Sequence, residues 1–210
     1  YDPEPRVLYY DVEASAEKGM PKPERPEARV LSIAAVDRGG REFFICEDDE
    51  GEIYRQFMEL TEGYDFLVGY NSGRRPSQGG WDLPYLVARA RRMRYPFDWR
   101  RTCWGDLMDM YQKVTQHRAG SLYSLAKRVL GREMEKPLAR GQEILRWFRE
   151  DRGRLEKYNL DDCRVLRELD RELGLVDIFC HVANLAKVSY TDAQSPYCVV
   201  DNLVIEEGKR

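Results

Sequence analysis

Two acidic residues, Asp11 and Glu13, lie two positions apart at the end of an apolar segment, RVLYYDVE, over residues 6–13. In a β-strand, side chains two positions apart point to the same face, so the two carboxylates are expected to project together. Neighbouring carboxylates repel each other, and they are stable side by side in water or around a cation. The pair therefore indicates either a metal site or a strand that has run out into solvent.

Asp162 is a third candidate ligand, and it lies in a helical pattern over residues 153–173. It follows Tyr158 by four positions, so the two side chains share one helix face. The same stripe carries Leu155, Leu166, Leu169 and Leu173. Burying a bare carboxylate is costly, so we expect Asp162 to be paired with an arginine of the helix or bound to a metal ion. Asp161 faces another direction and is expected to be solvated.

Asp82 is the fourth candidate, and it follows Trp81 where a glycine-rich loop becomes a helix. An aspartate at this position is also favoured as a helix cap or dipole partner. Together with the D-x-E pair and Asp162 it completes a set of four carboxylates. Mg²⁺ and Mn²⁺ prefer carboxylate oxygen ligands, and four carboxylates can hold two such ions about 3.5–4 Å apart. Two ions so placed can activate a water and stabilise the leaving 3′ oxygen when a phosphodiester is hydrolysed.

The elements that must position these residues change in kind along the chain. Strand-like apolar segments occupy 6–13, 29–37, 41–46 and 65–70, and helical patterns occupy 50–62, 81–94, 121–130, 142–149 and 153–173. A hairpin turn is expected at 38–40, loops are expected at 14–28, 72–80 and 131–141, and no clear period is seen over 187–210. Strands interleaved with helices, followed by helices, predict an α/β sheet flanked by helices.

The composition suits one domain of ordinary size, with 210 residues of which 42% are hydrophobic. The net charge of −3 means that any contact with nucleic acid must use a local basic patch. The five cysteines form no C-x-x-C pair, which argues against a structural zinc site and indicates free thiols in the cytoplasm. No apolar run approaches the roughly 20 residues that span a membrane, and we see no signal peptide. The chain begins at Tyr1 without a methionine, so we expect it to be either trimmed or cut from a longer one.

In these segments the sequence resembles the proofreading 3′–5′ exonuclease domain of family B DNA polymerases, which belongs to the DEDD superfamily and has a ribonuclease-H-like fold. The three motifs appear as YYDVEAS, VGYNSGRRPSQGGWDLPYLVARA and EKYNLDDCRVL. The residues that match family positions are Asp11, Glu13, Asn71, Asp82, Tyr158 and Asp162. Because a tyrosine stands four before the last aspartate, the resemblance is to the tyrosine type, DEDDy. Residues 105–111 and 121–131 look like the corresponding segments of archaeal members.

The resemblance implies a role for each acidic residue. Asp11 would bridge two Mg²⁺ or Mn²⁺ ions, Glu13 and Asp162 would hold the ion on the nucleophile side, and Asp82 would help to hold the other. Tyr158 would orient the attacking water by a hydrogen bond, unless it is an ordinary buried aromatic residue.

Residues of the second motif are expected to bind the substrate. Trp81 would stack on the terminal base or pack in the core, and Asn71 would hydrogen-bond the substrate backbone or simply form a turn. Arg74 and Arg75 lie in the intervening loop, which either overhangs the cleft so that they grip phosphates or is a mobile exposed tip.

The second motif also departs from the family pattern. Trp81 replaces the usual phenylalanine, and the interval from Asn71 to Asp82 is 82 − 71 = 11 residues, which is longer than usual. The domain that precedes the exonuclease in whole polymerases is missing, and no D-x-x-S-L-Y-P-S or Y-x-D-T-D motif follows. We therefore expect no DNA synthesis by this chain, which is either a fragment of a polymerase or a stand-alone relative.

These observations together predict a metal-dependent 3′–5′ exodeoxyribonuclease that acts on single-stranded DNA or frayed 3′ ends. Its expected partner is a DNA polymerase or the rest of a polymerase chain, and its expected place is the cytoplasm of a prokaryote, with an archaeal resemblance. Residues 1–175 would form the exonuclease domain and 176–210 a helical or irregular extension toward a polymerase palm. The alternatives are a 3′ exonuclease of the same superfamily that acts on RNA, and an inactive module that binds nucleic acid or docks a protein.

Overall fold

One mixed β-sheet forms the centre of the molecule. The computed structural model describes residues 4–15, 19, 21–77, 79–131 and 141–209. Within these residues the strands are β1 (Val7–Ala14), β2 (Val30–Asp37), β3 (Glu42–Ile45), β4 (Phe66–Gly69) and β5 (Cys103–Asp106), and they lie in the order β3-β2-β1-β4-β5. β1 pairs antiparallel with β2 and parallel with β4. β2 and β3 are antiparallel, whereas β4 and β5 are parallel. The central strand is therefore β1, which carries the first acidic pair.

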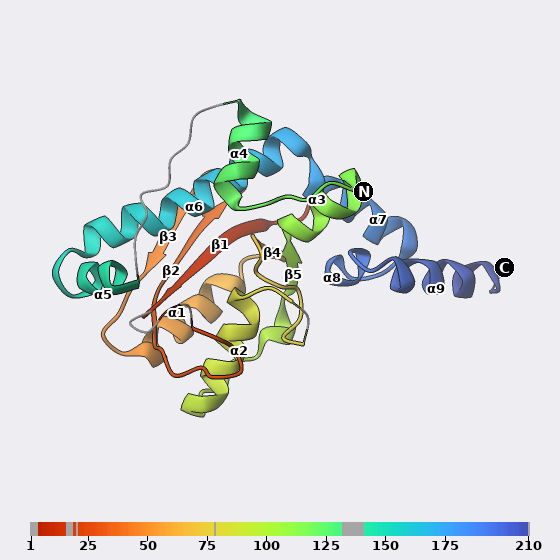
Figure 1. Ribbon diagram of the computed structural model, residues 1–210. Coiled ribbons are helices and arrows are strands. Elements are labelled where there is room, and N and C mark those ends of the chain that lie inside the picture. Colours follow the sequence, from red (N-terminus) through yellow and green to blue (C-terminus); the bar gives the residue numbers. More distant parts are fainter. Residues whose placement is uncertain (1–3, 16–18, 20, 78, 132–140, 210) are drawn as a thin grey trace.

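Helices cover both faces of this sheet (Figure 1). They are α1 (Glu50–Thr61), α2 (Asp82–Met93), the 3-10 turn η1 (Trp99–Arg101), α3 (Leu107–Thr115), α4 (Leu122–Leu130), α5 (Gly141–Glu150), α6 (Arg152–Leu173), α7 (Leu175–Ala186), α8 (Tyr190–Ala193) and α9 (Pro196–Glu207). α1 and α2 pack on one face, and α3, α4, α6 and α7 pack on the other. The predicted fold class, an α/β sheet flanked by helices with a helical second half, is confirmed. Among the helices that the structure describes, none has the length and apolarity needed to cross a membrane.

The alternation of side chains along β1 decides which layer each residue meets. Tyr9 lies in the core shared with α6, whereas its neighbours Leu8 and Tyr10 lie in the core shared with α1 and α2. Asp11 and Glu13 follow Tyr9 at steps of two, so the period of the strand turns both carboxylates toward the α6 layer. The fold therefore places the acidic pair opposite the helix that carries the last acidic motif.

Most of the predicted elements are confirmed to within a few residues, but some elements of the structure were not predicted. Strand β5 has four residues, CWGD, which are too few for a recognisable alternation. The tail over 187–210, which shows no clear period, contains α8 and α9. α8 has four residues, and α9 exposes large apolar side chains such as Tyr197 and Val204, so neither follows the usual amphipathic pattern. Residues 132–140 of the predicted 131–141 linker, and residues 16–18 and 20 of the predicted 14–28 loop, lie outside the described residues.

The helices after α6 differ in how they meet the rest of the molecule. α7 buries Val176, Phe179 and Cys180 in the same core as β1 and β4. α9 is half-buried or exposed along its length, and it extends away from the sheet (Figure 1). The division of the chain at 175/176 stays a prediction, and α7 shares its core with the elements on the other side of that division.

A buried hydrogen-bonded network ties β1 to the end of α6. The Tyr9 hydroxyl donates to Asp170 Oδ2 at 2.5 Å, and the backbone N–H of Val176 donates to Asp170 Oδ1 at 2.9 Å. Arg38, from the β2–β3 turn, lies 3.8 Å from the same carboxylate and pairs with Asp177 at 2.8 Å. Burial raises the pKa of Asp170, and the Tyr9 hydroxyl, the Val176 N–H and Arg38 oppose that rise. The network therefore stabilises a carboxylate that is 3% exposed.

We predict that Tyr9→Phe destabilises the protein by about 1–3 kcal/mol, because it removes a donor from a buried carboxylate without changing the ring. Denaturant unfolding followed by circular dichroism measures the change. Tyr64→Phe is the matched control, since its hydroxyl meets Asp37 at 3.3 Å in a half-buried position, and we expect about 0.5 kcal/mol or less. Equal losses for the two variants would contradict a special role for the Tyr9–Asp170 contact.

Candidate metal centre

The three acidic motifs meet at one cavity of about 310 Å³. Its lining includes Asp11, Glu13, Asn71, Trp81, Asp82, Tyr158 and Asp162. These residues come from β1, from the loop before α2 and the start of that helix, and from α6. Segments that are far apart in the sequence thus bring the predicted acidic and aromatic residues to one place, whereas Arg74 and Arg75 are not among the residues that line this cavity.

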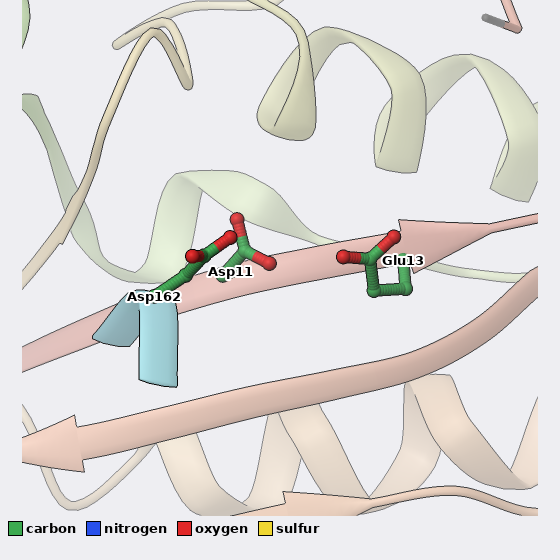
Figure 2. A group of neighbouring side chains, drawn as sticks. All are labelled: Asp11, Glu13 and Asp162. Atoms are coloured by element: carbon green, nitrogen blue, oxygen red, sulfur yellow. The ribbon is translucent and has the colours of Figure 1, made fainter. Parts of the chain in front are cut away.

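Three of the carboxylates lie close enough to share a cation. Asp11, Glu13 and Asp162 each offer an oxygen, and these oxygens lie within 4.8 Å of one another. Figure 2 shows Asp11 and Glu13 projecting from β1, with the carboxylate of Asp162 beside that of Asp11. All three ligand atoms are carboxylate oxygens, which are the donors that Mg²⁺ and Mn²⁺ prefer. The pair is not on a strand that simply runs out into solvent, because both residues are half-buried and Asp162 of α6 lies beside them.

Two arginines of α6 take part in ion pairs at the surface. Arg164 pairs with Glu42 at 2.7 Å and with Asp161 at 2.6 Å, and Arg152 pairs with Asp48. Asp161 is 41% exposed, in agreement with its predicted solvent position, whereas the neighbouring Asp162 is 6% exposed. The helix thus separates the two adjacent aspartates, one toward a surface ion pair and the other toward the cavity.

Asp82 lines the same cavity but is not part of the group within 4.8 Å. It begins α2, which has no side-chain cap, and it is 5% exposed. Burial raises the pKa of Asp82 well above its usual value, and the charges of Asp106 and Glu13 raise it further. Backbone N–H groups of Asp82 itself and of Val12 oppose the rise. The carboxylate is therefore costly to ionise in this position unless a cation is near.

Asn159 contacts Asp11 directly, and sequence reasoning did not identify it. Its Nδ2 donates to Asp11 Oδ2 at 2.7 Å, and its Oδ1 accepts from the Ser32 hydroxyl at 2.8 Å. Both Asn159 and Ser32 are fully buried. A signal was present in the sequence, because Asn159 precedes Asp162 by three positions and so lies near the same helix face.

Asp106, a buried acidic residue, was also missed by sequence reasoning. It ends β5, caps α3, and accepts hydrogen bonds at 3.0 Å from the backbone N–H groups of Asn71, Gly73 and Met108. Burial raises the pKa of Asp106, and the backbone N–H groups of Gly73, Asp109 and Asn71 lower it. Asp106 therefore anchors the loop of the second motif, and its available signal was the position of an aspartate directly before an apolar helical pattern.

The long loop of the second motif is closed at its base, which explains how it accommodates its extra residues. Trp81 N donates to Asn71 O at 2.7 Å, and Asn71 has a φ of 52°, in the left-handed region. A Cβ on Gly80 would lie 2.1 Å from Gly73 N, so the two backbones meet where no side chain fits. The loop therefore begins and ends at one pair of backbone contacts, and Asn71 and Trp81 stay in contact despite the long interval. The predicted turn role of Asn71 is thus confirmed, and its contact with substrate stays a prediction.

Arg74 and Arg75 fold back onto the neighbouring helices. Arg74 Nε lies 3.5 Å from Asp109 Oδ2, and its Nη1 donates to Thr191 O at 3.4 Å. Arg75 pairs with Asp192. Carboxylates of α3 and α8 thus hold the two guanidinium groups, which do not line the cavity. The choice between an overhanging loop and a mobile exposed tip stays a prediction. Phosphate binding by these two arginines stays a prediction that requires them to leave these partners.

Trp81 and Tyr158, two of the aromatic residues that line the cavity, are fixed by neighbouring residues. Trp81 stacks on Tyr85 with ring centroids 4.7 Å apart, and its Nε1 donates to Pro21 O at 2.7 Å. Tyr158 packs against Trp147 with centroids 5.4 Å apart and is half-buried. Each ring thus has a packing role and also lines the cavity. The predicted contacts of Trp81 with a base and of Tyr158 with water stay predictions.

Comparison with known proteins relates this geometry to a superfamily. The family model RNase_H_2, described as RNase_H superfamily, matches residues 8–174. A DNA polymerase from Archaeoglobus fulgidus is 29% identical over 173 residues, which cover 74% of this chain and 21% of that protein.

Among solved structures, a family B DNA polymerase from the hyperthermophilic archaeon Pyrobaculum calidifontis is similar, with a TM-score of 0.72 and 23% identity. The match covers 92% of this chain and 27% of that one. The chain thus spans about a fifth to a quarter of the length of these relatives. The predicted ribonuclease-H-like fold and the resemblance to family B DNA polymerases are confirmed.

We predict that Asp82→Asn stabilises the metal-free protein at pH 8 and that this gain shrinks toward pH 4. Because folding raises the pKa of Asp82, the cost of this group is absent below the unfolded value of about 4 and grows as the pH rises above it. Asparagine removes the charge and can still accept from the Val12 N–H. Each 1 kcal/mol of relieved cost raises Tm by about 2–4 °C in a domain of this size. Thermal unfolding in EDTA at the two pH values measures it, and a variant that melts earlier at both would contradict the assigned cost.

Proposed function

The chain belongs to the RNase H superfamily, and from that premise we propose that it is a divalent-metal-dependent nuclease that removes nucleotides from DNA 3′ ends. The observation that carries the proposal is the meeting of four acidic residues and Tyr158 at one cavity. Acidic side chains at a surface repel one another, so a crowded and partly buried set of carboxylates is costly to ionise unless cations are bound among them. A cavity of about 310 Å³ has room for a nucleotide terminus rather than for a folded duplex.

The residues present fit the ions that such a nuclease uses. Asp11, Glu13 and Asp162 would hold one Mg²⁺ or Mn²⁺, and Asp11 with Asp82 would hold a second. Bound ions would activate the attacking water and stabilise the leaving 3′ oxygen. The chain itself would supply the positions of these ligands, because β1 and α6 are regular elements packed against each other rather than loops.

Side chains around the acidic set would position the DNA end. Tyr158 would hydrogen-bond the attacking water and hold it in line, while its ring stays packed on Trp147. Trp81, already fixed by Tyr85 and Pro21, would present its ring to the terminal base. Asn71 would meet the strand backbone from the base of its loop. Each of these groups is held before substrate arrives, which lowers the entropic cost of binding.

The relatives suggest the setting of the reaction. The similar proteins are DNA polymerases, and this chain spans about a fifth of the length of one of them. We therefore propose a proofreading-like role on single-stranded or frayed 3′ ends, beside a polymerase or within the rest of a polymerase chain. Residues 1–175 would carry the reaction, and 176–210 would lead toward the polymerase part.

A digest of 5′-labelled single strands tests this function. With Mg²⁺ or Mn²⁺ we expect a ladder of products shortened from the 3′ end, and with EDTA we expect intact strands. A matched RNA strand and a 3′-phosphorylated DNA strand define the substrate and the polarity. Faster cutting of RNA would replace the DNA assignment, and uncut strands with either metal would favour an inactive binding module.

We predict that Asp11→Asn loses far more activity than the roughly 10–100-fold typical of an outer-shell change, because a shared ligand is lost. Asparagine can still accept from Asn159, so the melting temperature in EDTA should not fall. Asp161→Asn is the matched control, because that carboxylate pairs with Arg164 at the surface, and it should cut like the wild type. A variant of Asp11 that melts much earlier in EDTA would show that the residue is structural.

We predict that Tyr158→Phe slows single-turnover cutting by up to about 100-fold while metal binding is retained, because only the hydroxyl that positions water is lost. The ring and its packing on Trp147 remain. Rapid-quench kinetics with saturating Mn²⁺ measures the rate. An unchanged rate would leave Tyr158 as a packing residue.

A further inference from the structure

A buried amide links the carboxylate of Asp11 to the next strand of the sheet. Asn159 of α6 donates from Nδ2 to Asp11 Oδ2 at 2.7 Å and accepts at Oδ1 from the Ser32 hydroxyl at 2.8 Å. Ser32 lies on β2, where it is the register partner of Glu13. Asn159 and Ser32 are both 0% exposed, so water does not compete for these hydrogen bonds. The chain of contacts thus crosses from β2 through α6 to β1.

The chemistry of the three groups fixes which way the amide faces. An ionised carboxylate only accepts hydrogen bonds, so Asp11 requires the NH₂ group of Asn159. The Ser32 hydroxyl can donate to the carbonyl oxygen that remains. The opposite orientation would set the carbonyl of Asn159 against the carboxylate, which is repulsive. Ser32 therefore stabilises the one orientation of Asn159 in which Asp11 receives a donor.

We propose that Asn159, held by Ser32, is a positioning residue that fixes the Asp11 carboxylate for divalent-metal binding. The proposal rests on the proposed nuclease function, and it adds two residues to the motif set. A hydrogen bond to a charged acceptor in a buried place is short and strong, so it holds the carboxylate in one rotamer. A carboxylate has two oxygens with about four acceptor sites, so Asp11 can accept from Asn159 and still bind a cation. Donors of this outer kind orient the ligands of metal sites in general.

The test compares Mn²⁺ affinity across variants of the full chain, measured by calorimetry and by the electron paramagnetic resonance of free Mn²⁺. We expect Asn159→Leu, which keeps the size and loses the donor, to bind Mn²⁺ about 10- to 100-fold more weakly. Tyr54→Phe is the matched control, because it removes a buried hydrogen bond, of 2.9 Å to Leu86 O, on the other face of the sheet. It should lose stability and keep its Mn²⁺ affinity. Equal Mn²⁺ affinities for Asn159→Leu and the wild type would overturn the proposal.

A second pair of variants decides the question if Asn159→Leu does not fold. Ser32→Ala leaves the amide in place without its restraint, so we expect a smaller loss of Mn²⁺ affinity in the same direction. Ser32→Thr keeps the hydroxyl and should restore the affinity. A Ser32→Ala variant with wild-type Mn²⁺ affinity would overturn the role of Ser32, and with it the proposal that Ser32 and Asn159 together position Asp11.

These outcomes separate the positioning role of Asn159 from the nuclease function itself. A wild-type chain that binds Mn²⁺ without cutting DNA would overturn the nuclease proposal alone, and the affinities of the variants would still decide the role of Asn159. A wild-type chain that binds no Mn²⁺ would overturn both.

Discussion

Several carboxylates are crowded at one end of β1, and their mutual repulsion is the constraint that the surrounding structure must satisfy. Without a cation, the charges of Glu13 and Asp106 act on the buried Asp82 and raise its pKa. Fixed hydrogen-bond donors oppose this repulsion, and the described lining of the cavity contains no lysine or arginine. The amide of Asn159 meets Asp11, and backbone N–H groups meet Asp82 and Asp106. Neutral donors reduce the repulsion without cancelling the negative charge, which leaves the site suited to an added cation.

The same constraint makes the register of β1 against α6 decisive. A slip of one residue in β1 would turn Asp11 and Glu13 toward α1 and α2, where the neighbouring core cluster is apolar and aromatic. A buried and a part-buried contact hold the register on one face of the strand, Tyr9 with Asp170 and Asp11 with Asn159. Tyr9 precedes Asp11 in β1, whereas Asp170 follows Asn159 in α6. The helix therefore runs antiparallel to the strand. The contact that stabilises the fold and the contact proposed to orient Asp11 therefore belong to one packing arrangement.

Sequence reasoning could find the features that repeat with a period or stand at a boundary. Asp11 and Glu13 follow the strand period, and Asp162 follows the helix period, so the face that each residue occupies could be predicted. That these faces meet was implied by the resemblance to the exonuclease domain. Asn159 shares a helix face with Asp162, but its contacts could not be predicted, because a buried amide in a helix has the same local pattern as a solvated one and its partners are 127 and 148 residues away in the chain. The short strand β5 and the helix α8 likewise form through tertiary contacts that no local period announces.

Contacts beyond residue 175 extend this dependence to the second motif. Gln194 accepts from the backbone N–H of Asp106 at 3.1 Å, and Asp106 in turn holds Asn71 and Gly73 at the base of the loop. Asp192 pairs with Arg75 in the same loop. The helix that carries Asp82 begins directly after this loop, so its position depends on a segment more than 100 residues later. Residues beyond 175 therefore share core and polar contacts with the rest of the molecule, and these contacts reach the loop beside the candidate ligand Asp82. They cross the predicted boundary between α6 and α7.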